Sequence, residues 1–113
     1  MTKPTTRKKK NSLGETLVCN GVRVQVTSHA VEQYFNRIKG RDFVYSSGHE
    51  RSQVRKQIAK TVSEPEDIYH GKPKMPPIHI LGEAAVVVRT LGTTKADVLV
   101  PTVYHKNTFV DEG

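Results

Sequence analysis

A histidine and an arginine eight residues apart could act together on a phosphate group. They are His29 and Arg37, in the segment TSHAVEQYFNRI (27–38). A neutral imidazole near the start of a helix can serve as a general base, because the positive end of the helix dipole disfavours its protonated form. On a helix the two residues lie about 12 Å apart along the axis and about 80° apart around it. They could border one groove, with Gln33 between them. A polar helix face in water would carry the same residues, and periodicity alone favours this simpler interpretation.

Two further arginines, Arg51 and Arg55, are one helical turn apart beside an apolar stripe. A guanidinium group that projects over a sheet can bind a phosphate through two parallel hydrogen bonds. In the alternative interpretation, the aliphatic stems cover apolar surface and the charged groups reach water. The sequence leaves both interpretations open.

Near the end of the chain, Thr102 and Tyr104 are expected on one face of the last strand, because alternate residues of a strand share a face. A tyrosine beside arginines can orient a base or stack on it. A half-buried tyrosine with its hydroxyl group at the surface is the simpler alternative. His79 and Arg89 are expected on neighbouring strands and could join either group.

The remaining reactive residues predict no metal site and no cofactor. The five histidines form no HxxxH pair and no close set with carboxylates, and no cysteine pair exists. The sequence also contains neither GxxxxGK[ST] nor GxGxxG, the loops that bind nucleotide phosphates. Cys19 has no evident base beside it, so it is not expected to be a nucleophile. A single cysteine fits a reducing cytoplasm.

The distribution of charge favours a polyanionic partner. The 113 residues carry a net charge of +7, and five of the 18 Lys and Arg residues lie in residues 1–12, which contain no acid. From 23 to 60 there are eight basic residues against three acidic ones. Such patches bind phosphates without reading sequence, so we expect Lys8, Lys9 and Lys10 to contact nucleic acid. A solubilising arm is the alternative. The sequence has no apolar run of about 18 residues, so no membrane span is predicted. It also has no apolar segment near its start, so no secretory signal is predicted.

The elements that would position these residues follow an α+β order. Residues 1–12 are expected to be a disordered basic arm and residues 13–113 a single domain. Asn20-Gly21 predicts a type I′ hairpin between strands at about 16–19 and 22–27. A helix is expected over about 29–39, with Ser28 as its N-cap and Gly40 as its C-terminal stop.

A second helix is expected over about 48–63, where Ser47 and Glu50 form a capping box. Strands follow at 78–81, 84–91 and 97–106, with a short one near 67–70. Gly82-Glu83 suits a type II′ turn, and Pro101 marks an edge or a bulge in the last strand. The apolar run AAVVV is typical of a central strand covered on both faces. This order predicts two helices packed on one face of a three- to five-stranded antiparallel sheet, preceded by a β-hairpin.

The segment SHAVEQYFNR resembles a motif of small prophage and toxin-like proteins, in which His-Ala is followed by arginines at the fourth and eighth positions after the histidine. Ser28, His29, Ala30 and Arg37 match it, and Gln33 stands in place of the first arginine. The closing strand, VxTVY, also looks similar; its residues are Val100, Thr102, Val103 and Tyr104. Over about residues 27–106, the chain is similar to BrnT-like and RelE-like toxin ribonucleases, which share a barnase–EndoU–colicin–RelE fold.

This resemblance implies metal-independent RNA cleavage, in which a 2′-OH attacks the adjacent phosphate. It implies that His29 acts as base or acid, and that Arg37, Arg51 or Arg55 binds the phosphate. It also implies that Tyr104 and Thr102 position the scissile unit. The glutamine at position 33 removes one expected cation, so a relative that binds without cleaving is an alternative.

We therefore expect a cytoplasmic protein that engages nucleic acid, RNA rather than DNA, as a toxin-type ribonuclease or a catalytically silent relative. An antitoxin or a host protein is a further expected partner, and a membrane is not. The alternative class is a phage or mobile-element protein that inhibits a host enzyme by surface contact.

Overall fold

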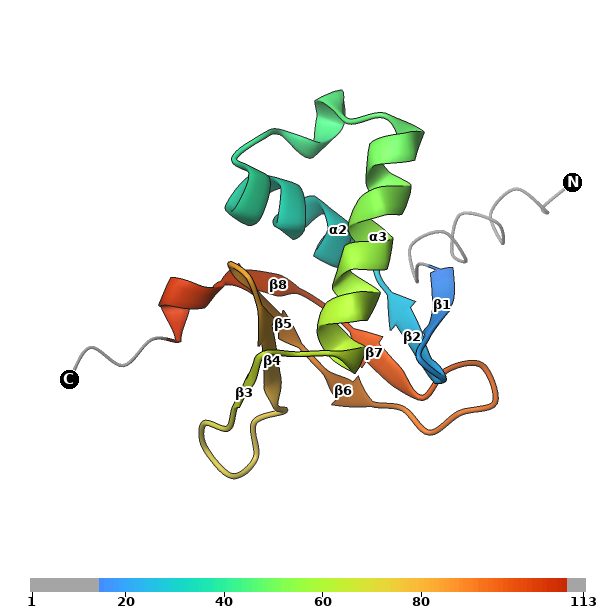
Figure 1. Ribbon diagram of the computed structural model, residues 1–113, viewed down its shortest axis with the longest axis vertical. Coiled ribbons are helices and arrows are strands. Elements are labelled where there is room, and N and C mark those ends of the chain that lie inside the picture. The colour runs from blue at the N-terminus through green and yellow to red at the C-terminus, as the bar shows by residue number, and fades with distance from the viewer. Residues whose placement is uncertain (1–14, 110–113) are drawn as a thin grey trace, which may run out of the picture.

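The computed structural model describes residues 15–109 (Figure 1). The expected arm, with Lys8, Lys9 and Lys10, lies outside this range. Within it, two α-helices and eight strands form an α+β fold. The strands make two four-stranded sheets, which we call sheet A (β1-β2-β7-β6) and sheet B (β3-β4-β5-β8).

The described part of the chain begins with the predicted hairpin. Strands β1 (Glu15–Cys19) and β2 (Val22–Val26) pair antiparallel, and Cys19 lies opposite Val22. Asn20 and Gly21 both have positive φ, 52° and 81°. Positive φ at both central residues is the requirement of a type I′ turn, so the prediction is confirmed.

The first helix differs from the prediction at both ends. Helix α2 (Ser28–Tyr34) continues into a π-helical turn, Phe35–Lys39, which Gly40 ends with a φ of 66°. Ser28 is not the N-cap. Thr27 is: its Oγ1 accepts a hydrogen bond of 3.0 Å from the Ala30 N–H and donates to a backbone carbonyl of the β7 region. His29 is therefore the second residue of the helix rather than the first.

Helix α3 (Gly48–Ser63) begins where the sequence predicts. The Glu50 N–H donates to Ser47 Oγ at 3.1 Å, and the Ser47 N–H donates to Glu50 Oε1 at 2.9 Å. Both halves of the capping box are therefore present. A short 3-10 turn, Phe43–Tyr45, connects this helix to the preceding π-helical turn.

The prediction of one antiparallel sheet is wrong, because two strands are interrupted. The expected strand 84–91 divides into β5 (Ala84–Val87) and β6 (Arg89–Thr90), and at the break the Val88 N–H donates to Pro77 O at 3.1 Å. The last strand divides around Pro101, which has no N–H to continue a ladder. Its halves are β7 (Val98–Val100) and β8 (Val103–His105). Strand β7 pairs parallel with β2, so sheet A is mixed.

The remaining strands of sheet B agree with the sequence. Strand β3 (Asp67–Tyr69) is the short strand expected near 67–70, and it pairs with β4 (Ile78–Leu81). Leu81 lies opposite Ala84, and Gly82 has a φ of 64°. The two-residue turn with a positive φ at its first central position agrees with the expected type II′ turn.

One main core joins the helices to both sheets (Figure 1). Phe35, Ile58, Val86 and Val103 are among its fully buried members, and they come from four different elements. A second, smaller cluster contains Ile78, Ala85 and Val87, packed by Ile80, Tyr104 and Phe109. Because alternate strand residues point to opposite faces, this cluster lies on the face of sheet B away from the main core. We call it the outer face. All four residues of β5 are buried, as AAVVV predicted.

In the described range no helix is long and apolar enough to cross a bilayer.

Candidate nucleic-acid interface

Arg37 and Tyr104 are in direct contact. The guanidinium carbon of Arg37 lies 4.7 Å from the centroid of the Tyr104 ring, and Nη1 donates a 3.1 Å hydrogen bond to the carbonyl of Val103. Strand β8 is at the edge of sheet B, so one of its sides has no neighbouring strand in that sheet. The arginine therefore reaches the edge strand from the π-helical turn and ends over the tyrosine ring.

Tyr104 is also the end of a row of aromatic rings. Its ring centroid lies 5.6 Å from that of Phe109 at an interplanar angle of 80°, and Phe109 lies 5.3 Å from Tyr69. These separations are typical of favourable ring pairs. We call Tyr69, Phe109 and Tyr104 the aromatic row. It crosses the outer face from one edge strand, β3, to the other, β8, where Arg37 caps it.

An apolar groove of about 410 Å³ runs beside this row. Thr102 and Tyr104 both line it, although Thr102 precedes β8 and the two residues do not share one strand as predicted. The structure therefore brings together three of the residues singled out in the sequence: Arg37, Thr102 and Tyr104. The full lining consists of Met75, Pro76, Ile78, Val87, Thr102, Tyr104, Thr108 and Phe109.

His29 is exposed near the start of α2, and Gln33 is half-buried one turn later. Among residues 15–109, no hydrogen bond or ion pair joins His29 to Arg37 or Tyr104. The contacts of the interface consequently come from the arginine, the tyrosine and the threonine, and the histidine takes no direct part in them.

Arg51 is engaged elsewhere. Its guanidinium carbon lies 4.1 Å from the centroid of the Phe43 ring, and its Nε donates to Ser46 Oγ at 2.8 Å. Arg51 thus holds the 3-10 turn against the first turn of α3. Arg55 is half-buried, and no acceptor within residues 15–109 is in hydrogen-bond range of its buried Nε.

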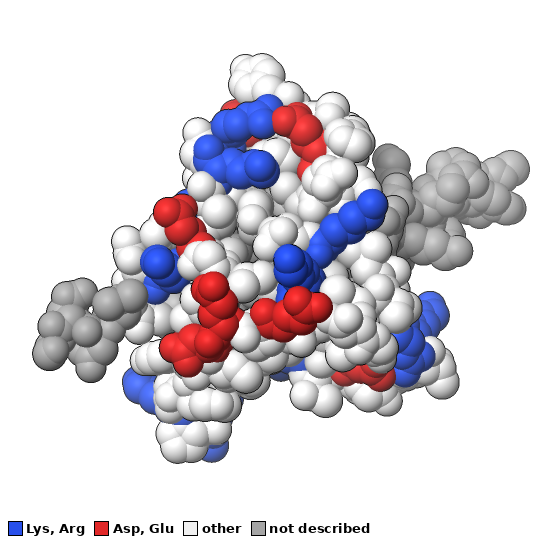
Figure 2. All heavy atoms as spheres, in the orientation of Figure 1, with Lys and Arg blue, Asp and Glu red and all other residues white. Residues whose placement is uncertain are grey.

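Two described cations of the stretch 23–60, Arg23 and Arg41, are paired with carboxylates. Arg23 contacts Asp97 at 2.9 Å, and its hydrogen bonds lower the pKa of that carboxyl group. Arg41 contacts Glu50 at 2.6 Å, and this contact, with the Ser47 N–H, lowers the pKa of Glu50 to about 2. Figure 2 shows acidic side chains among the basic ones on the face that carries the helices. The basic excess of this stretch therefore does not form one uniform positive surface.

Tyr34, the last residue of α2, is half-buried. Burial, with a smaller effect from the Glu83 carboxylate, raises the pKa of its phenol. Together with Lys39, Gln53, Val54 and Gln57, this tyrosine lines a smaller cleft of about 240 Å³.

Comparison with protein-family models, curated proteins and solved structures gave no match. The similarity to toxin ribonucleases therefore stays a prediction. Within the part of the chain that the structure describes, no group of three or more His, Cys, Asp or Glu side chains is placed to hold a metal ion.

The sequence did not reveal the roles of Tyr69 and Phe109. Tyr69 lies opposite Ile78 in the β3–β4 pair, and Phe109 follows the 3-10 turn Lys106–Thr108. Their meeting depends on strand register and on the path of the chain after β8. Local patterns specify neither.

Proposed function

We propose that this protein binds RNA at the edge of sheet B, where Arg37 lies over Tyr104. The contact between these two residues is the observation that carries the proposal. It presents an exposed cation stacked on a half-buried aromatic ring at an edge strand of the sheet. Every nucleotide contains a phosphate, which binds cations, and a base, which stacks on aromatic rings, so RNA is a suitable ligand for such a pair.

The geometry of Arg37 suits a phosphate. A guanidinium group has five N–H donors, and the bond to Val103 uses one of them. Stacking on Tyr104 holds the group in one orientation, so less side-chain freedom is lost when a phosphate oxygen binds. Thr102 adds a hydroxyl group to the same surface.

A binding measurement in EDTA tests this function. Labelled RNA is titrated with the wild-type protein and with Arg37→Ala and Tyr104→Ala. Lys95→Ala is the matched control, because it removes one exposed charge from the loop before β7. We expect each interface variant to weaken binding about 10-fold, which corresponds to about 1.4 kcal/mol, and the control to change it much less. An equal loss of RNA affinity in Arg37→Ala and in Lys95→Ala would contradict the proposal.

The same samples test for catalysis. Cleavage of the RNA in EDTA would add the metal-independent step that the resemblance implies, and His29→Ala should then abolish cleavage while binding remains. RNA that is bound but not cleaved would identify the chain as a catalytically silent relative that only binds RNA. No binding to any RNA would favour the alternative, contact with a host protein.

A further inference from the structure

A second groove adjoins the apolar groove. Its volume is about 320 Å³, and Met75 and Pro76 line both grooves, so the two are neighbours. Lys74 and Arg89 place two cations along it. The other lining residues are Pro77, Val88 and Thr90.

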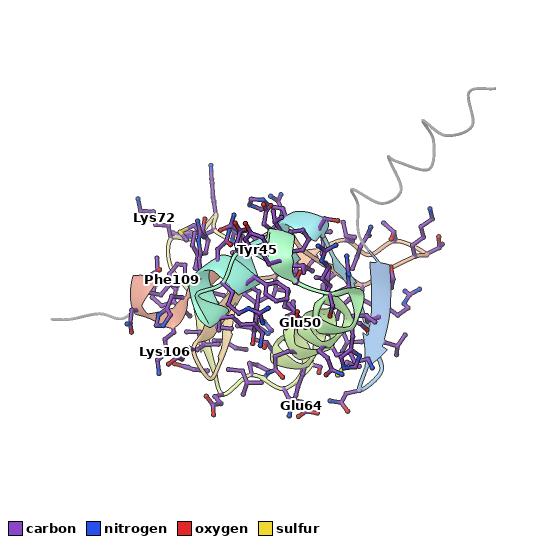
Figure 3. The ribbon with its side chains drawn as sticks, turned by 90° about the horizontal axis from the view of Figure 1, so that it is seen from above. Tyr45, Glu50, Glu64, Lys72, Lys106 and Phe109 are labelled. Atoms are coloured by element: carbon purple, nitrogen blue, oxygen red, sulfur yellow. The ribbon has the colours of Figure 1, made fainter. Side chains whose placement is uncertain are left out.

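The two cations of this second groove form no salt bridge with the described residues. Neither groove has an Asp or Glu in its lining, and within residues 15–109 neither Lys74 nor Arg89 forms a salt bridge. Figure 3 shows two more cations, Lys72 and Lys106, on the same side of the molecule as Phe109. Two cations without a salt bridge to a described residue, Lys74 and Arg89, beside an apolar groove are complementary to a ligand that is anionic at one end and aromatic at the other.

The apolar groove is suited to a flat ring. Tyr104 and Phe109 supply aromatic surface, Met75 supplies a polarisable thioether, and 40% of Met75 is exposed. Soft sulfur-containing side chains pack well against ring edges. Gly71 allows this arrangement, since a Cβ atom there would lie 3.1 Å from Met75 Sδ and 3.2 Å from the Tyr69 ring.

We propose that the two grooves together hold one unpaired nucleotide of a single-stranded RNA. The base occupies the apolar groove against Tyr104 and Phe109, and the phosphate lies between Lys74 and Arg89. Bases inside an A-form duplex are stacked on one another and cannot enter such a groove, whereas the bases of loops and free ends can. This inference rests on the proposed function and narrows it from RNA in general to unpaired strands.

The experiment compares three labelled ligands of equal length: oligouridine, a duplex, and a strand with ribose-phosphate units but no bases. Each is titrated with wild-type protein, Phe109→Ala, Phe109→Leu and the double variant Lys74→Gln/Arg89→Gln. The control double variant is Lys56→Gln/Lys95→Gln, which removes the same charge from exposed positions outside both grooves. Thermal unfolding of every variant shows whether it is folded, and Phe109→Leu keeps apolar bulk if Phe109→Ala unfolds.

We expect wild-type protein to bind oligouridine at least 10-fold more tightly than the duplex. Loss of the Phe109 ring should weaken oligouridine binding about 5- to 100-fold, the range of one base–aromatic stack, and leave the baseless strand unaffected. The Lys74/Arg89 variant should weaken both strands and reduce the salt dependence of binding, by about 0.7 in log–log slope per lost phosphate contact. The control variant should show smaller changes in affinity and in salt dependence.

Three results would overturn the inference. They are equal affinity for duplex and single strand, equal loss of both single strands on removal of the Phe109 ring, and displacement of oligouridine by polyglutamate as readily as by RNA. If Arg37→Ala weakens RNA binding while the Phe109 and Lys74/Arg89 variants behave like the control, the proposed function stands and this inference fails. If no RNA binds the wild-type protein, the proposed function itself fails.

Discussion

The guanidinium group of Arg37 lies over the ring of Tyr104, although the two residues belong to the first helical segment and the last strand. The same guanidinium group donates to the carbonyl of Val103, the residue before the tyrosine. One side chain thus links the middle of the π-helical turn to the edge of sheet B. Its contribution to stability and its contribution to binding can be separated by substitution.

Replacing Arg37 by lysine should keep the charge but remove the planar stack and the directed hydrogen bond. A cation over a ring at an exposed site is worth about 0.5–1 kcal/mol, and a neutral hydrogen-bond acceptor adds an amount of similar size. We expect the free energy of unfolding of Arg37→Lys to fall by about 1 kcal/mol in urea denaturation, with RNA affinity between those of wild type and Arg37→Ala. Unchanged stability would show that the stack contributes nothing measurable.

Ser47→Ala removes one half of the capping box of α3. Its Oγ accepts the Glu50 N–H, and loss of such a cap costs about 1 kcal/mol of protein stability. The control is Ser52→Ala, an exposed position within the same helix, where alanine has the higher helix propensity and stability should not fall. Urea denaturation of the two variants measures the difference, and equal values would refute the role of the cap.

Acid should weaken the start of α3 through Glu50. Hydrogen bonds from Arg41 and the Ser47 N–H lower the pKa of its carboxyl group from 4.5 to about 2. A lowered pKa means that the stabilisation is present above the unfolded-state value and is lost as the pH falls from about 4.5 towards 2. Melting temperatures between pH 2 and 6 should therefore depend less steeply on pH in Glu50→Gln than in wild type. Parallel profiles would contradict this linkage.

His79 should give a second pH dependence, closer to neutrality. Burial lowers the pKa of its imidazole below 6.5, and the nearby His70 acts in the same direction, although the hydrogen bond to Val62 O opposes them. Because the folded state resists protonation, stability should fall as the pH drops below about 6.5.

The variant His79→Asn isolates this effect. In the wild type, Nδ1 lies 2.9 Å from Val62 O and therefore carries a hydrogen, which an asparagine amide can imitate without titrating. Denaturation at pH 5 and pH 8 should give a smaller difference for the variant than for the wild type. A difference as large as that of the wild type would assign the pH dependence to other groups.

Local signals in the sequence predicted most of the helices and turns. The capping box at Ser47, the stop at Gly40 and the Asn20-Gly21 turn each depend on a few adjacent residues, and the structure confirms all three. The N-cap of α2 was misassigned to Ser28, because the preference for Thr27 comes from its bonds to the β7 region, far away in the sequence.

The division into two sheets could not be predicted in the same way. Residues 84–91 read as one strand, and the break at Val88 depends on its hydrogen bond to Pro77. Pro101 did indicate an interruption of the last strand, because proline interrupts a ladder of hydrogen bonds. The sequence could not show that the chain would join a second sheet there. The parallel pairing of β2 with β7 is likewise a long-range choice.

The candidate site was predicted in part. Arg37, Thr102 and Tyr104 were singled out and lie together, whereas Arg51 packs on Phe43. Side-chain type and spacing select residues that can do chemistry. Which of them meet is decided by strand register and by competing partners such as the Phe43 ring.

The π-helical turn Phe35–Lys39 makes the contact between Arg37 and Tyr104 sensitive to chain length as well as to residue type. Asn36 is exposed, so its own side chain contributes nothing to the core. Deletion of Asn36 would nevertheless turn the following arginine by about 100° around the helix axis, away from Tyr104. In an alignment of homologous chains, a one-residue gap between Phe35 and Gly40 should therefore mark proteins that keep the arginine but have lost its contact with the tyrosine.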